Sequence, residues 1–222
     1  MLKDHTIPPL KGDAPTSAVI ILHGYGDSGS GGLLEIGQLW QRSLPHTEFL
    51  CPDAPFPFEM APPDFGGRQW FSLRTTDPHD IEAGVVNAAP YVNDYIDHVL
   101  ATRHLKPSQL VLSGFSQGSM MSLYVGPRRA EQLAGVIGYS GMLVGGDKLA
   151  AEKKTTPPVL LAHGTADDVV PFARMDQAER GLKAVNIPVT AIPCPGTGHG
   201  IDQKGLQEGL RFLLEKLPPI PT

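Results

Sequence analysis

Short apolar runs rich in β-branched residues alternate along the chain with longer segments of helical periodicity. Several runs are apolar at every position rather than at every second one, which is typical of strands buried on both faces of a parallel sheet. This alternation of strands and helices predicts an α/β fold. The predicted strands are Ala18–Leu22, Glu48–Cys51, Leu110–Leu112, Gly135–Tyr139, Val159–Ala162 and Val189–Ile192.

The segments between these runs favour helices. Pro90 lies inside one of them, so we expect that helix to be kinked or split there. No internal repeat or shift of composition marks a linker, so the sequence predicts a single domain over residues 1–222, with 1–16 as an N-terminal extension. The predicted helices cover roughly 32–44, 79–104, 117–130, 172–186 and 202–217, the last with leucines at helical spacing.

Residues 52–74 break this alternation. They contain five prolines, four phenylalanines and Trp70, without helical or strand periodicity. A loop of this length in a compact domain is usually functional or disordered, and the aromatic content argues against disorder. Two interpretations stay open: a lid-like loop that walls a substrate site, or an ordered surface loop pinned by its aromatic residues.

The charge and the cysteines exclude several classes of protein. The formal net charge is -5, so there is no basic field to attract nucleic acid. The longest aliphatic run, Ala18–Leu22, is too short to span a bilayer, and residues 1–17 lack the apolar core of a secretory signal. Cys51 and Cys194 have no metal-like spacing; the sequence leaves open whether they pair. We expect a cytoplasmic protein without stable membrane insertion.

Gly114-Phe115-Ser116-Gln117-Gly118 matches the pattern G-x-S-x-G between a predicted strand and a predicted helix. A sharp strand-to-helix turn is where α/β hydrolases expose a nucleophilic serine. The flanking glycines remove side chains that would clash where the strand folds back against the helix. Ser116 is therefore the candidate nucleophile; the alternative is a glycine-rich turn without chemistry.

A serine hydroxyl needs a base to take its proton. Of the eight histidines, His199 lies in the flexible segment Gly196-Thr197-Gly198-His199-Gly200, between the last predicted strand and the last predicted helix. It has room there to lean over the strand ends. An ordinary histidine titrates near pH ~6.5, so a neutral imidazole is available as base at neutral pH.

An acid is needed to orient that imidazole. Asp167 and Asp168 both follow the strand Val159–Ala162, which gives the chain order serine, aspartate, histidine of the α/β hydrolases. Composition and order do not decide between the two aspartates, and the spare one could cap the following turn. Residue type alone also permits a metal site from His23, Asp27, His163 and Asp167, but each has a better role elsewhere.

Two backbone donors are needed for the developing oxyanion. In this fold one comes from the residue after the nucleophile, here Gln117, and one from the loop after an early strand. Residues 23–32, HGYGDSGSGG, form such a loop. They contain neither the P-loop pattern nor a G-x-G-x-x-G that opens a helix, so a phosphate-binding role is not indicated.

Four ordered motifs, LHGYGDSG, GFSQGSMMSL, HGTADDVVP and GTGHG, resemble the carboxylesterase/phospholipase branch of the α/β hydrolases, which includes acyl-protein thioesterases and lysophospholipases. The resemblance implies an α/β-hydrolase fold without a large cap domain, Asp167 as the acid and Tyr25 as the second oxyanion donor, where leucine is usual. Acyl-protein thioesterases have W-F-D where this chain has Trp70-Phe71-Ser72, and this departure favours a bacterial-type esterase. A homodimer is implied by the resemblance alone.

The implied activity is hydrolysis of short- to medium-chain acyl esters through an acyl-enzyme intermediate, without cofactor or metal. We expect the substrate to be a small-molecule ester, held in an apolar acyl site. Thioester or lysophospholipid hydrolysis by the same triad, or an inactive hydrolase fold that serves as a binding module, are the alternatives. The expected substrate-binding residues are Phe65, Trp70, Phe71, Met142 and Leu143.

Overall fold

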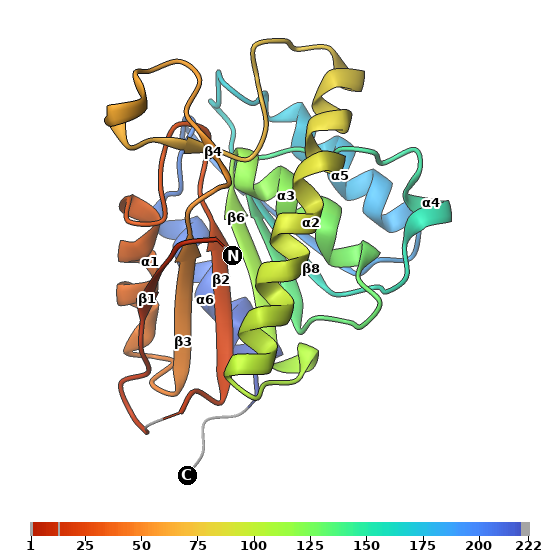
Figure 1. The fold of residues 1–222 in the computed structure, drawn as a ribbon. Helices are drawn as coiled ribbons and strands as arrows, with labels where there is room; N and C mark the ends of the chain where they lie inside the picture. Colours follow the sequence, from red (N-terminus) through yellow and green to blue (C-terminus); the bar gives the residue numbers. More distant parts are fainter. Residues whose placement is uncertain (1, 13, 219–222) are drawn as a thin grey trace.

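The computed structural model describes residues 2–12 and 14–218, built around a seven-stranded sheet of strand order β1-β3-β2-β6-β7-β8-β9 (Figure 1). Strands β2 to β9 of this sheet run parallel, and β1 pairs antiparallel with β3 at one edge. All carboxyl ends of the parallel strands therefore meet at one edge of the sheet. The strands are β1 Asp4–Ile7, β2 Ser17–Leu22, β3 Thr47–Pro52, β6 Leu110–Phe115, β7 Gly135–Tyr139, β8 Val159–Gly164 and β9 Val189–Cys194.

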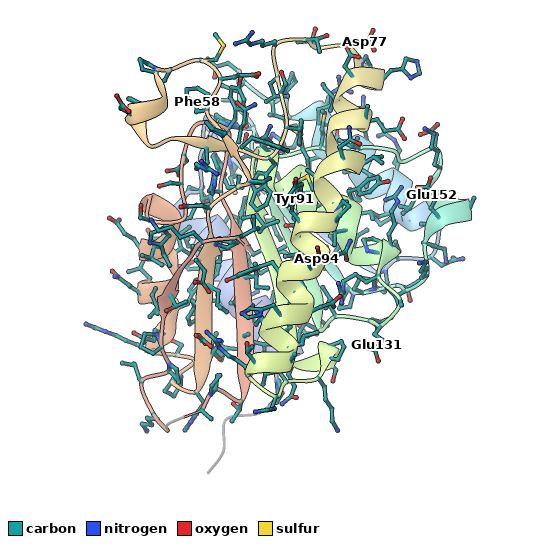
Figure 2. All side chains as sticks on the ribbon, in the orientation of Figure 1. Phe58, Asp77, Tyr91, Asp94, Glu131 and Glu152 are labelled. Carbon is teal, nitrogen blue, oxygen red and sulfur yellow. The ribbon has the colours of Figure 1, made fainter. Side chains whose placement is uncertain are left out.

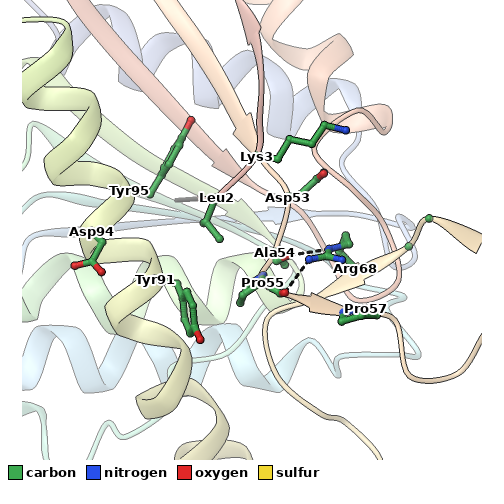
Figure 3. A pocket seen from close by; sticks show the side chains of 12 residues that line it. Leu2, Lys3, Asp53, Ala54, Pro55, Pro57, Arg68, Tyr91, Asp94 and Tyr95 are labelled. Carbon is green, nitrogen blue, oxygen red and sulfur yellow. Dashed lines mark hydrogen bonds between the residues drawn. The ribbon is translucent and has the colours of Figure 1, made fainter. Parts of the chain in front are cut away.

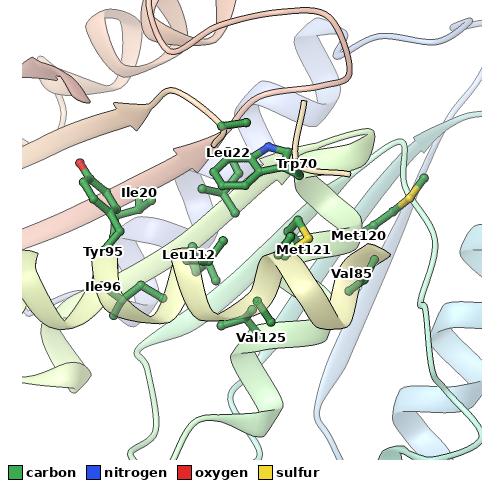
Figure 4. Close-up of a cluster of buried hydrophobic side chains, with 14 of the residues drawn as sticks. Ile20, Leu22, Trp70, Val85, Tyr95, Ile96, Leu112, Met120, Met121 and Val125 are labelled. Carbon is green, nitrogen blue, oxygen red and sulfur yellow. The ribbon is translucent and has the colours of Figure 1, made fainter. Parts of the chain in front are cut away.

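Helices cover both faces of the sheet. On one face, α2 (Pro78–Thr102) and α3 (Gln117–Arg128) enclose a hydrophobic cluster with alternate residues of β2, such as Ile20 and Leu22 (Figure 4). Further along the sheet, α5 (Ala173–Ala184) packs with α3 in a second cluster. On the opposite face, α1 (Gly32–Gln41) and α6 (Gln203–Lys216) pack against the other alternate residues, such as Val19. This burial on two faces explains the uninterrupted apolar runs.

All six predicted strands and all five predicted long helices are confirmed, with shifts of a few residues at their ends. Of the two outcomes expected at Pro90, a kink or a split, the split is wrong, because α2 runs unbroken through this residue. The carbonyl that loses its helical partner is that of Val86, and both Val86 and Pro90 are exposed residues. A short helix, α4 (Leu149–Glu152), was not predicted.

The N-terminal extension contains strand β1, which the sequence did not predict. Its four residues, Asp4 to Ile7, are mostly polar, and only Ile7 is buried. Pairing with β3 at the sheet edge, rather than an apolar run, defines this strand. Both cysteines are free and buried.

Residues 52–74 form an ordered strap across the carboxyl edge of the sheet. Two short strands, β4 (Phe56–Pro57) and β5 (Arg68–Gln69), pair antiparallel around a 3-10 turn at Pro63–Phe65. Backbone hydrogen bonds join Arg68 to the loop after β2: Gly26 N donates to Arg68 O at 2.9 Å, and Arg68 N to Asp27 O at 2.8 Å. The strap is thus attached to the loop that we expected to supply an oxyanion donor. No helix of the described ranges is both long and apolar enough to cross a membrane.

Candidate active site

Ser116 lies at the turn between β6 and α3 with φ 53° and ψ -115°. A side chain in this left-handed region costs of order 1–3 kcal/mol and persists only where the surroundings impose it. Here the flanking glycines allow the turn: a Cβ at position 114 would collide with the carbonyl of Gly118, and one at 118 with the carbonyl of Leu22. The clash predicted from the motif is confirmed.

Ser116, His199 and Asp167 form a continuous hydrogen-bonded relay. His199 Nε2 lies 2.9 Å from Ser116 Oγ, and His199 Nδ1 lies 2.9 Å from Asp167 Oδ2. The three residues follow the carboxyl ends of β6, β9 and β8, which the parallel sheet brings to one edge. Asp168 is exposed, so the structure selects the aspartate that the residues alone left undecided.

The Asp167 carboxylate is buried, but backbone amides donate hydrogen bonds to it. Its Oδ1 accepts from the amides of Val169 and Val170 at 3.0 and 2.9 Å. Burial alone would raise the pKa of Asp167, but hydrogen bonds from His199 and from these two amides outweigh it, so the pKa lies below its ordinary value. Asp167 therefore stays ionised beside the imidazole at working pH.

His163 also supports Asp167. Its Nε2 lies 3.2 Å from Asp167 Oδ2 and 2.8 Å from the carbonyl oxygen of Val170, and its ring is buried. Residue type alone had made His163 a possible metal ligand, and its contact with Asp167 was not predicted. Among the described residues, no group of three or more His, Cys, Asp or Glu side chains is placed to hold a metal ion.

The amides of Tyr25 and Gln117 lie on the two segments that flank Ser116. Gln117 N belongs to the first residue of α3, where helix amides have no partner within the helix. Tyr25 lines the same cavity as Ser116. Donors at the start of a helix and in a glycine-rich loop can stabilise an oxyanion formed at the serine.

The strap holds both of these segments through side chains. Gln117 Oε1 accepts from Trp70 N, and its Nε2 donates to Phe71 O, both at 2.8 Å. Trp70 Nε1 donates to the carbonyl oxygen of His23 at 3.0 Å. His23 is buried, and this burial lowers its pKa; its Nε2 accepts from Ala54 N at 3.0 Å, which requires the neutral ring.

Four of the five expected substrate-binding residues do not line the cavity that contains Ser116. Trp70 and Phe71 are strap residues whose side chains are buried in the hydrophobic core instead of lining the cavity. Phe65 is 67% exposed at the outer turn of the strap. Leu143 lines a neighbouring pocket of about 300 Å³, and Met142 lines both that pocket and the cavity at Ser116.

The cavity at Ser116 has a volume of about 520 Å³ and also contains His199. Its wall is mostly apolar; part of it flanks the serine and aspartate motifs or belongs to the strap, whereas Ile81 and Arg174 come from α2 and α5, where no motif marks them. The wall residues are Leu73, Ile81, Phe115, Met120, Val169, Val170 and Pro171, together with Thr75, Thr76 and Arg174.

A larger cavity of about 680 Å³ lies between the N-terminal segment, the strap and α2 (Figure 3). The guanidinium of Arg68, which lines this cavity, donates hydrogen bonds to the carbonyl oxygens of Ala54 and Pro55. None of the relay residues lines it, so the smaller cavity is the candidate active site.

Comparison with known proteins agrees with this geometry. Residues 9–216 match the phospholipase/carboxylesterase family. The chain belongs to this family. It is a serine hydrolase with the α/β-hydrolase fold.

Individual members of the phospholipase/carboxylesterase family are similar over almost the whole chain. The esterase PE8 structure shares 38% identity at a TM-score of 0.92, covering 97% of this chain and 99% of that one. Proteins named acyl-protein thioesterase 1 share 35% identity in Emericella nidulans, covering 96% of this chain and 94% of the relative, and 32% in Aspergillus fumigatus, covering 97% and 93%.

The relay predicts separate effects of pH on activity and on stability. A histidine base acts only in its neutral form, so kcat/KM should fall in acid while the fold persists. The depressed pKa of Asp167 stabilises the fold above the ordinary carboxyl pKa of about 3.9, and this stabilisation is lost as the pH falls through the lower folded value. Initial rates and thermal unfolding across the same buffers test both; a flat rate between about pH 5 and 9 would contradict His199 as the base.

Glu59 connects the Tyr25 loop to the cavity wall. Its Oε1 accepts from Tyr25 Oη at 2.5 Å, Ser72 Oγ at 2.9 Å and Leu73 N at 3.0 Å. Burial, with this hydrogen bond, raises the pKa of Tyr25 to about 12, so its hydroxyl stays a donor. The two family positions at which this chain departs, Tyr25 and Ser72, thus share one carboxylate.

We expect Glu59→Ala to lower kcat about tenfold with little change in KM, because a displaced oxyanion donor costs less than the factor of about 10²–10³ for a donor that is lost. Steady-state kinetics measure both constants. Arg74→Ala is the control, since it removes an exposed partner of Glu59, at 3.4 Å from Oε2 and 3.1 Å from the carbonyl oxygen, and keeps the carboxylate that Tyr25 contacts. Equal effects of the two variants would show that the Tyr25 contact has no catalytic importance.

Proposed function

We propose that this protein is a carboxylesterase that hydrolyses small-molecule esters of short to medium acyl chains. The observation that carries the proposal is the relay from Ser116 through His199 to Asp167, at 2.9 Å for each step, inside a largely apolar cavity of about 520 Å³. A cavity of this size and lining suits a small apolar ligand.

In the proposed reaction, His199 Nε2 takes the proton of Ser116 while Oγ attacks the ester carbonyl. The carbonyl oxygen becomes an oxyanion held by the amides of Tyr25 and Gln117. The bond to the alcohol oxygen then breaks, and His199 returns the proton to that oxygen. Water, deprotonated by the same imidazole, attacks the acyl carbon; the bond to Ser116 Oγ breaks, His199 returns the proton to Oγ, and the acid is released.

The cavity wall predicts how the rate depends on acyl length. A fully buried methylene contributes about 0.8 kcal/mol, which corresponds to about a fourfold gain in kcat/KM for each added carbon while the wall accommodates it. We therefore expect kcat/KM for 4-nitrophenyl esters to rise with chain length and then to fall when the chain outgrows the cavity. Met120→Trp, which fills the wall, should move the optimum to shorter chains. An optimum unchanged in this variant would place the acyl chain elsewhere.

Thioester hydrolysis is the second candidate, and the relatives named acyl-protein thioesterase 1 favour it. An oxygen ester, a thioester and a lysophospholipid with the same acyl chain separate the candidates. The proposal predicts the highest kcat/KM for the oxygen ester. A thioester preferred by tenfold or more would replace carboxylesterase by thioesterase with the same three residues.

A further inference from the structure

A second hollow, which we call the α1 cleft, adjoins the catalytic cavity. It has a volume of about 340 Å³ and shares two lining residues, Asp27 and Phe115, with that cavity. Its apolar wall comes from α1, from the segment before α6 and from the first turn of α6. The residues concerned are Leu33, Ile36, Leu39, Ile201 and Leu206.

The two hollows lie toward opposite faces of the sheet. Ile81, Met120 and Val170 of the catalytic cavity belong to the hydrophobic cluster under α2 and α3. Leu33 and Ile36 of the α1 cleft belong to the cluster under α1 and α6. Ser116 follows β6 at the carboxyl edge between these layers (Figure 1). A substrate bound at Ser116 can therefore extend to both sides of the sheet edge.

His199 lines the catalytic cavity, and its ring lies against a residue that this cavity shares with the α1 cleft. The ring of Phe115, which is shared by both hollows, has its centroid 4.9 Å from that of His199, and Ile201 lies two residues further along the chain. In the proposed reaction the leaving oxygen receives its proton from His199, so the alcohol must depart beside this imidazole. Phe115 and Ile201 lead from this imidazole into the α1 cleft, so the alcohol can leave along the cleft while the acyl chain occupies the larger cavity.

The charges of the two hollows differ. Asp27 and Glu35 line the α1 cleft, and Glu35 is exposed on α1. No lysine or arginine lines this cleft in the part of the chain that the structure describes, whereas Arg174 lines the catalytic cavity. Two carboxylates without a cation repel an anionic group, and this discriminates against a leaving group with a phosphate or carboxylate.

We propose that the α1 cleft binds the alcohol half of the ester and selects uncharged, apolar alcohols. The proposal rests on the proposed esterase function and deepens it by naming the leaving group. Under this proposal, the cleft favours neutral alkyl or aryl esters over substrates whose leaving group carries a phosphate, such as lysophospholipids or coenzyme A thioesters.

The first test varies only the alcohol, from methyl to hexyl butyrate, and measures kcat/KM by release of butyrate. An open cleft buries part of each methylene, so we expect about a twofold gain per carbon in the wild type. In Leu39→Asp, the increase of log kcat/KM per added carbon should be at most half of the wild-type increase. Leu214→Asp is the matched control, since Leu214 is an exposed leucine of α6 outside the cleft, 48% accessible against 63% for Leu39.

The second test changes charge. Glu35→Lys should raise the ratio of kcat/KM for an aryl butyrate with a carboxylate on its leaving group to that for the neutral aryl butyrate by about two- to fivefold, and added salt should reduce the gain. Glu131→Lys makes the same change before β7, at the amino end of the parallel strands and away from the carboxyl edge where the cleft lies. It should leave the ratio unchanged (Figure 2).

The outcomes distinguish this inference from the proposed function. Turnover of butyrate esters with no dependence on alcohol length, or equal slopes in Leu39→Asp and Leu214→Asp, would overturn the leaving-group site and leave the esterase in place. If Glu35→Lys and Glu131→Lys shift the ratio of kcat/KM for the anionic to the neutral aryl ester equally, the leaving-group site is likewise overturned and the esterase stays in place. No hydrolysis of any ester by the wild type would overturn both proposals.

Discussion

Ser116→Ala should lower kcat/KM for ester hydrolysis by about 10⁵- to 10⁶-fold, because the other groups of a triad achieve little without the nucleophile. Alanine keeps the Cβ that already occupies the left-handed turn at φ 53°, so the fold and its strain should be retained. Hydrolysis of 4-nitrophenyl butyrate, with circular dichroism and thermal unfolding of both proteins, measures activity and fold together.

Ser119→Ala is a matched control for that substitution. Ser119 is buried one turn further along α3, and its hydroxyl has no hydrogen-bond partner among the described residues. Its removal should change kcat/KM by less than about twofold, since no catalytic contact is lost. Equal rates for wild type and Ser116→Ala would exclude the serine mechanism and support a binding module instead.

Asp167→Asn should lower kcat about 10³- to 10⁴-fold, through the tautomer of His199. Asp167 Oδ1 accepts from Val169 N and Val170 N, so an asparagine at this position keeps its carbonyl oxygen there. Its amide then faces His199 Nδ1 and donates to it. The imidazole must carry its proton on Nε2, toward Ser116, and it can no longer accept the serine proton.

Asp168→Asn makes the same chemical change one residue away, on an exposed side chain. It should leave kcat within about twofold of the wild type. Steady-state kinetics at a pH where the wild type is fully active compare the two variants. If Asp168→Asn has the larger effect, the acid of the relay is misassigned.

The fold could be predicted from the sequence because parallel strands buried on both faces leave a clear pattern. The runs Ala18–Leu22 and Val159–Ala162 are apolar at every position, and both are fully buried strands. Because these strands run parallel, the loops that follow them meet at one edge, so motifs 83 residues apart in sequence, at Ser116 and His199, could be expected to meet. Strand β1 has no such pattern and depends on its pairing with β3.

The substrate wall could not be predicted in the same way. Aromatic residues near a catalytic motif suggested a wall at Trp70 and Phe71, but both are core residues that position Gln117 and His23. The residues that do line the cavity, such as Ile81 and Arg174, are separated in sequence and share no motif. Their convergence depends on how α2 and α5 pack over the sheet, which local sequence does not encode.

The choice between Asp167 and Asp168 could not be made from the sequence residues alone either. Both have the same charge and follow the same strand. Only the turn decides, because it directs Asp167 inward to His199 and to two backbone amides, and leaves Asp168 exposed.

Detection of the acyl-enzyme would test the proposed mechanism most directly. The protein would be mixed with 4-nitrophenyl butyrate, quenched in acid within the first turnover and analysed by intact and peptide mass spectrometry. We predict one added butyryl group, on Ser116, and none in Ser116→Ala. Rapid turnover without any butyryl adduct, or an adduct on another residue, would contradict a covalent intermediate at Ser116.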